Sequence, residues 1–325
     1  MKRFVTFLCG ALLAMGACRR DRTEGKTMPS QPGITHVRKL IANFFNAHDP
    51  SVARDYFAED VLWHGMSMGD YRGVEGYAQA MAGFWRALPD ARAIEQDAIE
   101  SGDRVVMRFL VEATHRGELW GIPGTGSRVR WDATMIYRMD GGKIAEQWSV
   151  EDWAAILRDL GVAALPYASG RETASGTGST TKVSSDGPLA RGLIRIGEEA
   201  IERENDAAYD AYFAESYVLH GPLGDMTRDE LKRYFASLRA AFSNFRITRE
   251  RILTDGKWLA ARNTMSGTFD HFFEMSPIGA VQPNGRHVRF EVINLFHYDD
   301  KGRLLEEWVQ VDNLGLLRQL GVRVP

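Results

Sequence analysis

Residues 148–162 read WSVEDWAAILRDLGV, and residues 308–322 read WVQVDNLGLLRQLGV. Each stretch places a Trp four positions before an Asp and ends in Leu-Gly-Val. A second pair precedes them in the same order: residues 53–65 read ARDYFAEDVLWHG, and residues 209–221 read YDAYFAESYVLHG. Two blocks that recur about 160 residues apart indicate a duplicated whole domain rather than a short solenoid repeat.

Polar stretches rich in Gly, Ser and Thr separate the repeated parts. Residues 169–187 read SGRETASGTGSTTKVSSDG, which is typical of a flexible linker. A length of 325 residues also fits two domains. The sequence therefore predicts a tether over residues 18–33, domain 1 over 34–165, a linker over 166–187 and domain 2 over 188–325.

The first residues have the pattern of an export signal. Lys2 and Arg3 supply positive charge, and residues 4–17 form an apolar run too short for an ordinary membrane-spanning helix. The run ends in MGAC, and small residues before a Cys are typical of a lipoprotein signal. We therefore expect residues 1–17 to be a signal peptide and Cys18 to be lipidated. The protein would be exported to the cell envelope or periplasm, with the lipid as its only membrane anchor. A plain secretory signal cut near Ala17 is the alternative.

The composition argues against several classes of function. The two cysteines, Cys9 and Cys18, lie in the first 18 residues, so the body of the chain has no thiol for a disulfide, a Cys-based zinc site or catalysis. A net charge of −3 without a basic stripe gives no reason to expect a nucleic-acid partner. The glycines of residues 121–126 do not open a helix after a strand, so they are not a phosphate loop. We expect no metal and no cofactor.

Helical patterns come first in domain 1, and strand patterns follow. Helices followed by a mostly antiparallel sheet indicate an α+β fold. We expect two tandem cone-shaped domains, each an α+β barrel in which N-terminal helices pack on a curved sheet that encloses a pocket. In domain 1 the predicted helices are 34–47, 50–57 and 74–88, the strands are 105–115, 129–139 and 144–150, and a closing helix is 152–160.

Alternation along the strands selects the side chains that would face this pocket. His115 is in phase with the apolar face of its strand, Tyr137 is in phase with Trp131, and His64 directly follows a short strand. Burial would raise the pKa of an inward carboxylate toward the range useful for proton transfer. On the last strand, the residues predicted to share the inward face are Ile144, Glu146, Trp148, Val150 and Asp152.

Each candidate also has a structural alternative. Asp152 can cap the helix that follows it, and His115 can hydrogen-bond a carbonyl at the end of its strand. The other candidates can shape turns, form ion pairs or fill the core; they are His64 and His220, Glu146 and Glu306, and Trp148 and Trp308.

Three blocks in domain 1 resemble one known family. Residues 113–126 (ATHRGELWGIPGTG), 137–152 (YRMDGGKIAEQWSVED) and 157–162 (LRDLGV) occur in the order found in SnoaL-like polyketide cyclases, which belong to the nuclear-transport-factor-two-like superfamily. The resemblance implies an α+β cone and a cofactor-free ring closure by intramolecular aldol condensation. It also implies that Asp152 is the general acid/base, and it places the family's His on His115.

Domain 2 is similar to the same family over a shorter span. It keeps the closing block, which contains Trp308 and Asp312, but Phe269 stands where domain 1 has His115. His297 is expected in the register of Tyr137. We therefore expect Asp312, His220, His297 and Trp308 to bind ligand, as we expect of Trp131, Glu146 and Trp148 in domain 1. The resemblance further implies pairing of such domains through their sheets, as an intramolecular pseudo-dimer or a homo-oligomer.

Three functions fit these patterns. The first is a cofactor-free cyclase or isomerase in which Asp152 removes a proton from a small carbonyl compound and His115 or Tyr137 steadies the enolate oxygen. The second is a binding protein of the envelope that holds an apolar small molecule without chemistry. The third is a structural partner protein, since a fold alone does not decide between these functions.

Overall fold

The computed structural model describes residues 32–162, 165–166 and 187–323. The predicted signal peptide, the lipidation site Cys18 and most of the predicted tether and linker lie outside the described residues. The described residues from Pro32 onward belong to one compact unit.

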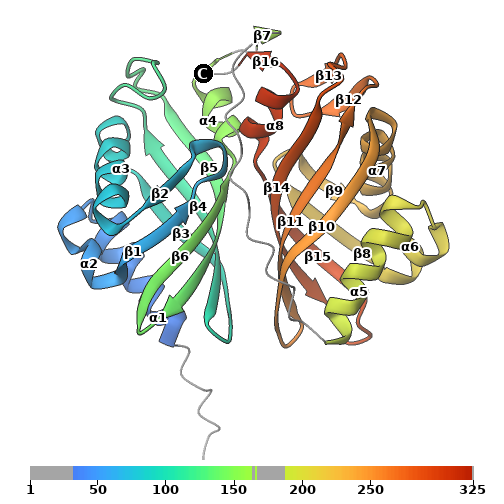
Figure 1. Ribbon diagram of the computed structural model, residues 1–325, viewed down its shortest axis with the longest axis horizontal. Helices are drawn as coiled ribbons and strands as arrows, with labels where there is room; N and C mark the ends of the chain where they lie inside the picture. The colour runs from blue at the N-terminus through green and yellow to red at the C-terminus, as the bar shows by residue number, and fades with distance from the viewer. Residues whose placement is uncertain (1–31, 163–164, 167–186, 324–325) are drawn as a thin grey trace, which may run out of the picture. The chain divides into compact units, whose positions relative to one another are not determined.

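We call the first repeat, residues 32–162, copy 1, and the second, residues 187–323, copy 2. Copy 1 begins with helical segments and contains six strands (Figure 1). Its helical elements are α1 (Pro32–Leu40), η1 (Ile41–Phe45), η2 (Pro50–Val52), α2 (Ala53–Tyr56), η3 (Met66–Met68), α3 (Val74–Ala87) and α4 (Trp153–Asp159). Its strands are β1 (Phe57–His64), β2 (Asp70–Arg72), β3 (Arg92–Ser101), β4 (Arg104–Thr114), β5 (Arg128–Asp140) and β6 (Lys143–Glu151).

Copy 2 repeats this order of elements. Its helical elements are α5 (Pro188–Ile196), η4 (Gly197–Glu202), α6 (Asp206–Tyr212), α7 (Arg228–Ala241) and α8 (Asn313–Gln319). Its main strands are β8 (Phe213–Gly221), β9 (Gly224–Thr227), β10 (Phe242–Asp255), β11 (Trp258–Phe269), β14 (His287–Tyr298) and β15 (Leu304–Val311). A small hairpin is formed by β12 (Phe273–Ser276) and β13 (Gly279–Val281), and β7 (Leu165–Pro166) pairs with β16 (Val322–Arg323).

The two six-stranded sheets have the same topology. Copy 1 has the strand order β2-β1-β6-β5-β4-β3, and copy 2 has β9-β8-β15-β14-β11-β10. Neighbouring strands are antiparallel except β1 with β6 and β8 with β15, which are parallel. The predicted α+β class with two tandem domains is confirmed. The expected barrel is wrong, because each sheet ends in two edge strands and does not close on itself.

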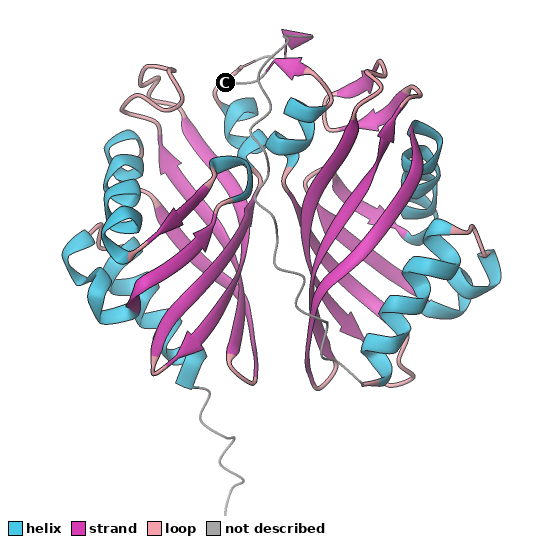
Figure 2. Cartoon of the chain, viewed as in Figure 1, coloured by secondary structure: helices cyan, strands magenta, loops and turns pink. Residues whose placement is uncertain are grey.

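Helices cover one face of each sheet (Figure 2), and each copy has its own apolar core there. Local sequence explains where the helices start. Asp49 accepts a hydrogen bond from the backbone N–H of Ser51 before η2, and Thr227 with Glu230 forms a capping box at the start of α7.

A third apolar cluster joins the opposite faces of the two sheets. Reciprocal cation–π contacts accompany it: the Arg108 guanidinium lies 5.2 Å from the Trp308 ring centre, and that of Arg262 lies 5.2 Å from the Trp148 ring centre. Since Arg108 and Arg262 hold the same position in the two copies, the contact has approximate two-fold character. The cluster comprises Ile99, Val106, Ile136, Trp148 and Val150 of copy 1 with Leu253, Ala260, Ile293 and Leu295 of copy 2.

Candidate functional site

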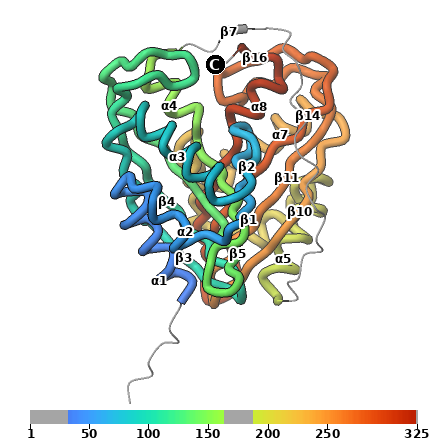
Figure 3. Tube along the Cα trace, turned by 60° about the vertical axis from the view of Figure 1, so that its left-hand side comes forward, coloured from blue at the N-terminus to red at the C-terminus, as the bar shows by residue number. Residues whose placement is uncertain are grey.

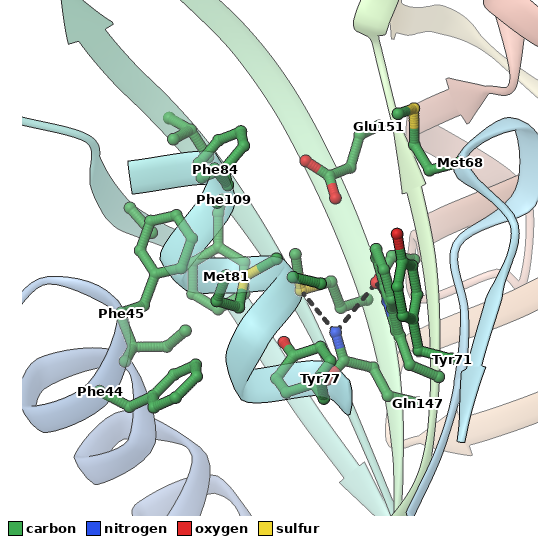
Figure 4. A pocket seen from close by; sticks show the side chains of 18 of the residues that line it. Phe44, Phe45, Met68, Tyr71, Tyr77, Met81, Phe84, Phe109, Gln147 and Glu151 are labelled. Atoms are coloured by element: carbon green, nitrogen blue, oxygen red, sulfur yellow. Dashed lines mark hydrogen bonds between the residues drawn. The ribbon is translucent and has the colours of Figure 1, made fainter. Parts of the chain in front are cut away.

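Copy 1 encloses a cavity of about 210 Å³ between its sheet and its helices. Aromatic and methionine side chains form most of the wall, and no Lys or Arg is among the lining residues. Figure 4 shows side chains from the helical segments and from the strands converging on this space. Its aromatic wall includes Phe44, Phe45, Trp63, Phe84, Phe109 and Trp120.

Glu151, at the end of β6, is a carboxylate in this cavity wall whose pKa is strongly raised by burial. Its residue surface is only 8% exposed, and its side chain points from β6 toward the cavity (Figure 4). Burial raises its pKa to about 7, and the opposing influence is a hydrogen bond of 2.9 Å that Trp131 Nε1 donates to Oε2. A carboxyl group with that pKa exchanges protons readily near neutral pH.

Glu151 corrects the predicted phase of the last strand. The inward residues are Gln147, Ser149 and Glu151, whereas Glu146, Trp148 and Val150 lie on the opposite face. Ile144 does face the core of copy 1, but the register with β5 shifts between Ile144 and Glu146. This one-residue bulge reverses the side of every residue after it.

Neutral hydrogen-bonding groups line the same cavity as Glu151. Tyr137 lines the cavity, as predicted, and burial raises its pKa well above the ordinary value, so the phenol stays protonated. Among the described residues, the acceptor for its hydroxyl is the Met135 sulfur, at 3.0 Å, which is a weak acceptor. Ser149 Oγ accepts from Trp63 Nε1 at 2.7 Å and from Gln147 Nε2 at 2.9 Å. The buried Gln147 Oε1 has no hydrogen-bond partner among the described residues.

Asp152 does not line this cavity. Its carboxylate caps α4, where Oδ1 accepts from the backbone N–H of Ala155 at 3.2 Å. Asp152 therefore caps a helix, as the alternative interpretation of the sequence expected. Its side chain lines a second cavity, to which copy 2 also contributes. Burial raises the pKa of Asp152 above its ordinary value.

His115 is also apart from the cavity lining. It is fully buried, and its Nδ1 lies 3.2 Å from Thr125 Oγ1. Backbone hydrogen bonds join His115 to Gly126 and Ser127, so the residue closes the base of the loop over residues 116–126. That loop carries Trp120 to the cavity wall.

His64, Glu146 and Trp148 form a separate cluster on the opposite face of the sheet. His64 Nε2 lies 3.0 Å from Glu146 Oε1, and the imidazole stacks on Trp148 with 5.3 Å between ring centres. Arg138 Nε donates to Glu146 Oε2 at 3.0 Å. The predicted inward placement of Glu146 and Trp148 is wrong because of the bulge in β6, and His64, which pairs with Trp148 from β1, lies on the same outer face. Trp131 is buried and holds Glu151 rather than forming the wall itself.

Copy 2 repeats the outer cluster. His220 Nε2 lies 3.1 Å from Glu306 Oε1, and the ring stacks on Trp308. Asp312 caps α8 through the backbone N–H of Gly315. His297 stacks on Trp258, and the register puts Phe296 rather than His297 at the position of Tyr137, which corrects that prediction. Phe269 does take the register of His115, since its N–H donates to the carbonyl of Arg286 just as that of His115 donates to Ser127.

The interior of copy 2 holds a polar network where copy 1 has apolar wall. Asn263 Nδ2 donates to Asn294 Oδ1, and Asn294 Nδ2 donates to Glu307 Oε1, each at 2.6 Å. The hydroxyl of Tyr217 donates to Glu307 Oε2 at 2.6 Å. The strand register shows which positions are equivalent in the two copies. Asn263, Asn294 and Glu307 stand where copy 1 has Phe109, Met135 and Gln147, and Val311 stands where copy 1 has Glu151.

The described residues contain no group of His, Cys, Asp and Glu arranged to hold a metal ion. Within the same described part of the chain, no helix combines the length and apolarity needed to cross a membrane.

Comparisons with known proteins agree with the duplication. The family model of SnoaL-like polyketide cyclases matches residues 35–160 and again 192–320, which confirms the resemblance in two tandem copies. The aklanonic acid methyl ester cyclase DauD of Streptomyces sp. (strain C5) is 26% identical over 135 residues, covering 40% of this chain and 82% of that protein.

Two solved structures also match part of the chain. Wild-type IdmH of Streptomyces antibioticus is 29% identical, with a TM-score of 0.37, and the match covers 41% of this chain and 100% of that one. A SnoaL-like polyketide cyclase of Agrobacterium tumefaciens is 22% identical, with a TM-score of 0.33, and the match covers 40% of this chain and 94% of that one.

Proposed function

Because both halves match the family model, the chain belongs to the SnoaL-like polyketide cyclase family, and we propose that copy 1 is a cofactor-independent acid–base enzyme for a carbonyl compound. The observation that carries this proposal is the buried carboxylate of Glu151 in an aromatic cavity, with a pKa of about 7. At that pKa, a substantial fraction of the group is ionised at neutral pH and can act as a base.

In the proposed reaction, Glu151 removes a proton from the carbon next to a carbonyl group. The enolate oxygen accepts a hydrogen bond from the neutral Tyr137 phenol, which is a suitable donor because burial keeps it protonated. In a cyclase, the enolate carbon then bonds to a second carbonyl carbon of the same molecule, and the new alkoxide takes the proton back from Glu151. In an isomerase, the proton returns to a different carbon.

The cavity also suggests features of the substrate. An aromatic wall without Lys or Arg favours a flat, uncharged molecule, since an anion would meet the Glu151 carboxylate without a compensating cation. The free acceptor at Gln147 Oε1 favours a substrate that carries a hydroxyl group.

The second candidate is a binding protein without chemistry, which the predominantly apolar wall also supports. Mass spectrometry of small molecules that co-purify with the full chain from its native cells would separate the two, comparing wild type, Glu151→Gln and Asp152→Asn. The proposal expects Glu151→Gln to carry a carbonyl compound and wild type to carry its cyclised or rearranged isomer. If Asp152→Asn alone accumulates the precursor, Asp152 is the base. If all three carry the same compound, or none, the enzyme proposal fails.

Copy 2 is proposed as a built-in partner of copy 1 rather than a second catalyst. The support is the apolar cluster with its reciprocal Arg–Trp contacts and the replacement of Glu151 by Val311. Light scattering of the full chain lacking residues 1–17 should give a monomer. A dimer in which copy 1 of one chain pairs with copy 1 of a second chain would contradict this arrangement.

Export with a lipid anchor at Cys18 is likewise a proposal, supported by the charged start, the short apolar run and the MGAC ending. Labelling of cells with a radioactive fatty acid should mark the wild-type protein and leave Cys18→Ser unmarked. A protein that keeps residues 1–17 and carries no lipid would contradict the proposal.

A further inference from the structure

A second cavity, of about 350 Å³, lies where α4 of copy 1 meets α8 of copy 2. The two helices contact one another, and they lie side by side in both Figure 1 and Figure 3. Most of the lining is apolar and comes from both copies. It includes Leu157, Val162, Pro222, Leu223, Ile278 and Leu317.

Two buried polar side chains also line this cavity. Asp152 is 5% exposed and Asn313 is 3% exposed. Oδ1 of Asp152 already accepts from the N–H of Ala155 and, at 3.4 Å, from Asn313 Nδ2. For Oδ2, the described residues supply no hydrogen-bond donor within bonding distance. Oδ2 is not among the fully buried unpaired atoms of the described residues, and Asp152 lines the cavity, so a molecule in the cavity can donate a hydrogen bond to this oxygen.

Asp312, the equivalent carboxylate of copy 2, has different neighbours. Ser67 of η3 lies close enough to Asp312 to oppose the rise that burial causes in the pKa of that carboxyl group, and the Ser67 carbonyl accepts from Arg318 Nη1 at 3.0 Å. The turn that contains η3 therefore covers Asp312.

A small difference in sequence explains this asymmetry. Residues 64–70 read HGMSMGD, whereas residues 220–225 read HGPLGD, which is one residue shorter and has no serine. Pro222 in the shorter turn has no backbone N–H to donate. The shorter turn leaves Leu223 40% exposed, and Ile278, across the cavity mouth, is 43% exposed. The duplicated fold thus keeps a buried carboxylate at both positions, but a cavity lies beside Asp152 and η3 lies beside Asp312.

We propose that this cavity binds a small amphipathic molecule whose hydroxyl or ammonium head donates a hydrogen bond to Asp152. Its apolar body lies against Leu157 and Leu317 and covers Leu223 and Ile278 at the mouth. An anionic head is disfavoured at Asp152 by like charge, although the exposed Arg158 at the rim would attract it there. Because both copies form the walls, the bound molecule stabilises their contact.

Three probes of matched shape test the proposal on the full chain: cyclohexylmethanol, cyclohexylmethylamine and cyclohexanecarboxylate. Ligand-observed NMR titration should give saturable binding of the alcohol and the amine. The carboxylate should bind at least about tenfold more weakly, because a charge-assisted hydrogen bond contributes on that scale. Asp152→Asn, which can still cap α4, should weaken the amine by a similar factor, and Asp312→Asn should not.

Two variants locate the site. Leu223→Trp fills the mouth from an exposed turn and should abolish binding, whereas Met81→Trp, which fills the cavity of copy 1, should leave it unchanged. Equal binding of all three probes overturns the proposal, because Asp152 then plays no part in it. Binding that survives Leu223→Trp overturns it too, because the probes then lie elsewhere. If every probe binds only as a non-saturable response, the cavity is not a ligand site.

Discussion

The two copies share strand order, register and capping aspartates, yet their interiors differ in kind. Copy 1 has an aromatic cavity with one buried carboxylate, while copy 2 has a hydrogen-bonded network around Glu307 at the corresponding inward positions. The outer cluster of His, Glu and Trp is retained in both copies. The fold therefore depends on positions that the copies share, and the chemistry depends on a few inward positions at which they differ.

The largest expected effect is on catalytic activity, and it should distinguish Glu151 of copy 1 from Glu307 of copy 2. Glu151→Gln should lower kcat/KM by about a thousandfold, since a positioned general base contributes on that order. Glu307→Gln, at a buried carboxylate of the other copy, should change kcat/KM less than threefold. Steady-state kinetics with the compound recovered from the Glu151→Gln protein would measure both. Equal losses in the two variants would mean that copy 2 shares the catalysis.

The next effect concerns stability and is expected only in copy 2. Asn294→Leu removes the acceptor of the Asn263 amide and the donor to Glu307 Oε1, while Tyr217 still donates to Oε2; two lost buried hydrogen bonds should cost about 4 kcal/mol of unfolding free energy. The register-matched control in copy 1, Met135→Leu, should cost less than about 1.5 kcal/mol because it exchanges apolar groups of similar volume. Denaturant unfolding would compare them. Similar costs would show that the polar network contributes nothing specific.

The pH dependence of stability should single out Glu151. Its folded-state pKa of about 7 exceeds the ordinary 4.5, so its protonation favours the folded state. This contribution is complete below pH 4.5 and is lost as the pH rises through 7. Relative to Glu151→Gln, wild type should therefore lose on the order of 3 kcal/mol between pH 4.5 and 8. Parallel stability curves for the two proteins would contradict the raised pKa.

The smallest effect tests the cause of that pKa. Trp131→Phe removes the indole N–H that stabilises the charged carboxylate while it keeps an aromatic ring in place. The pKa of Glu151 should rise by about one further pH unit, since a hydrogen bond to a charged group contributes on that scale. A titration that leaves the midpoint unchanged would show that the Trp131 contact is not maintained in solution.

The duplication and the order of elements could be predicted because repeated blocks, helical periodicity and turn residues are local signals. Strand β3 was missed because its residues, 92–101, are mostly polar, and the two buried ones, Ala93 and Ile99, do not form an alternating pattern. The phase of β6 was wrong because a bulge after Ile144 has no signature in a single sequence. As a result Asp152 was selected in place of its neighbour Glu151. Contacts such as Ser67 with Asp312 join residues far apart in the chain, so only the folded structure reveals them.

The central claim is that copy 1 holds a proton-exchanging carboxyl group, and infrared difference spectroscopy of wild type against Glu151→Gln tests it without a substrate. The account predicts a protonated carboxyl band that is present in wild type, absent from the variant, and titrates with a midpoint near pH 7. A midpoint near the ordinary value of 4.5, or a band that persists in Glu151→Gln, would contradict it.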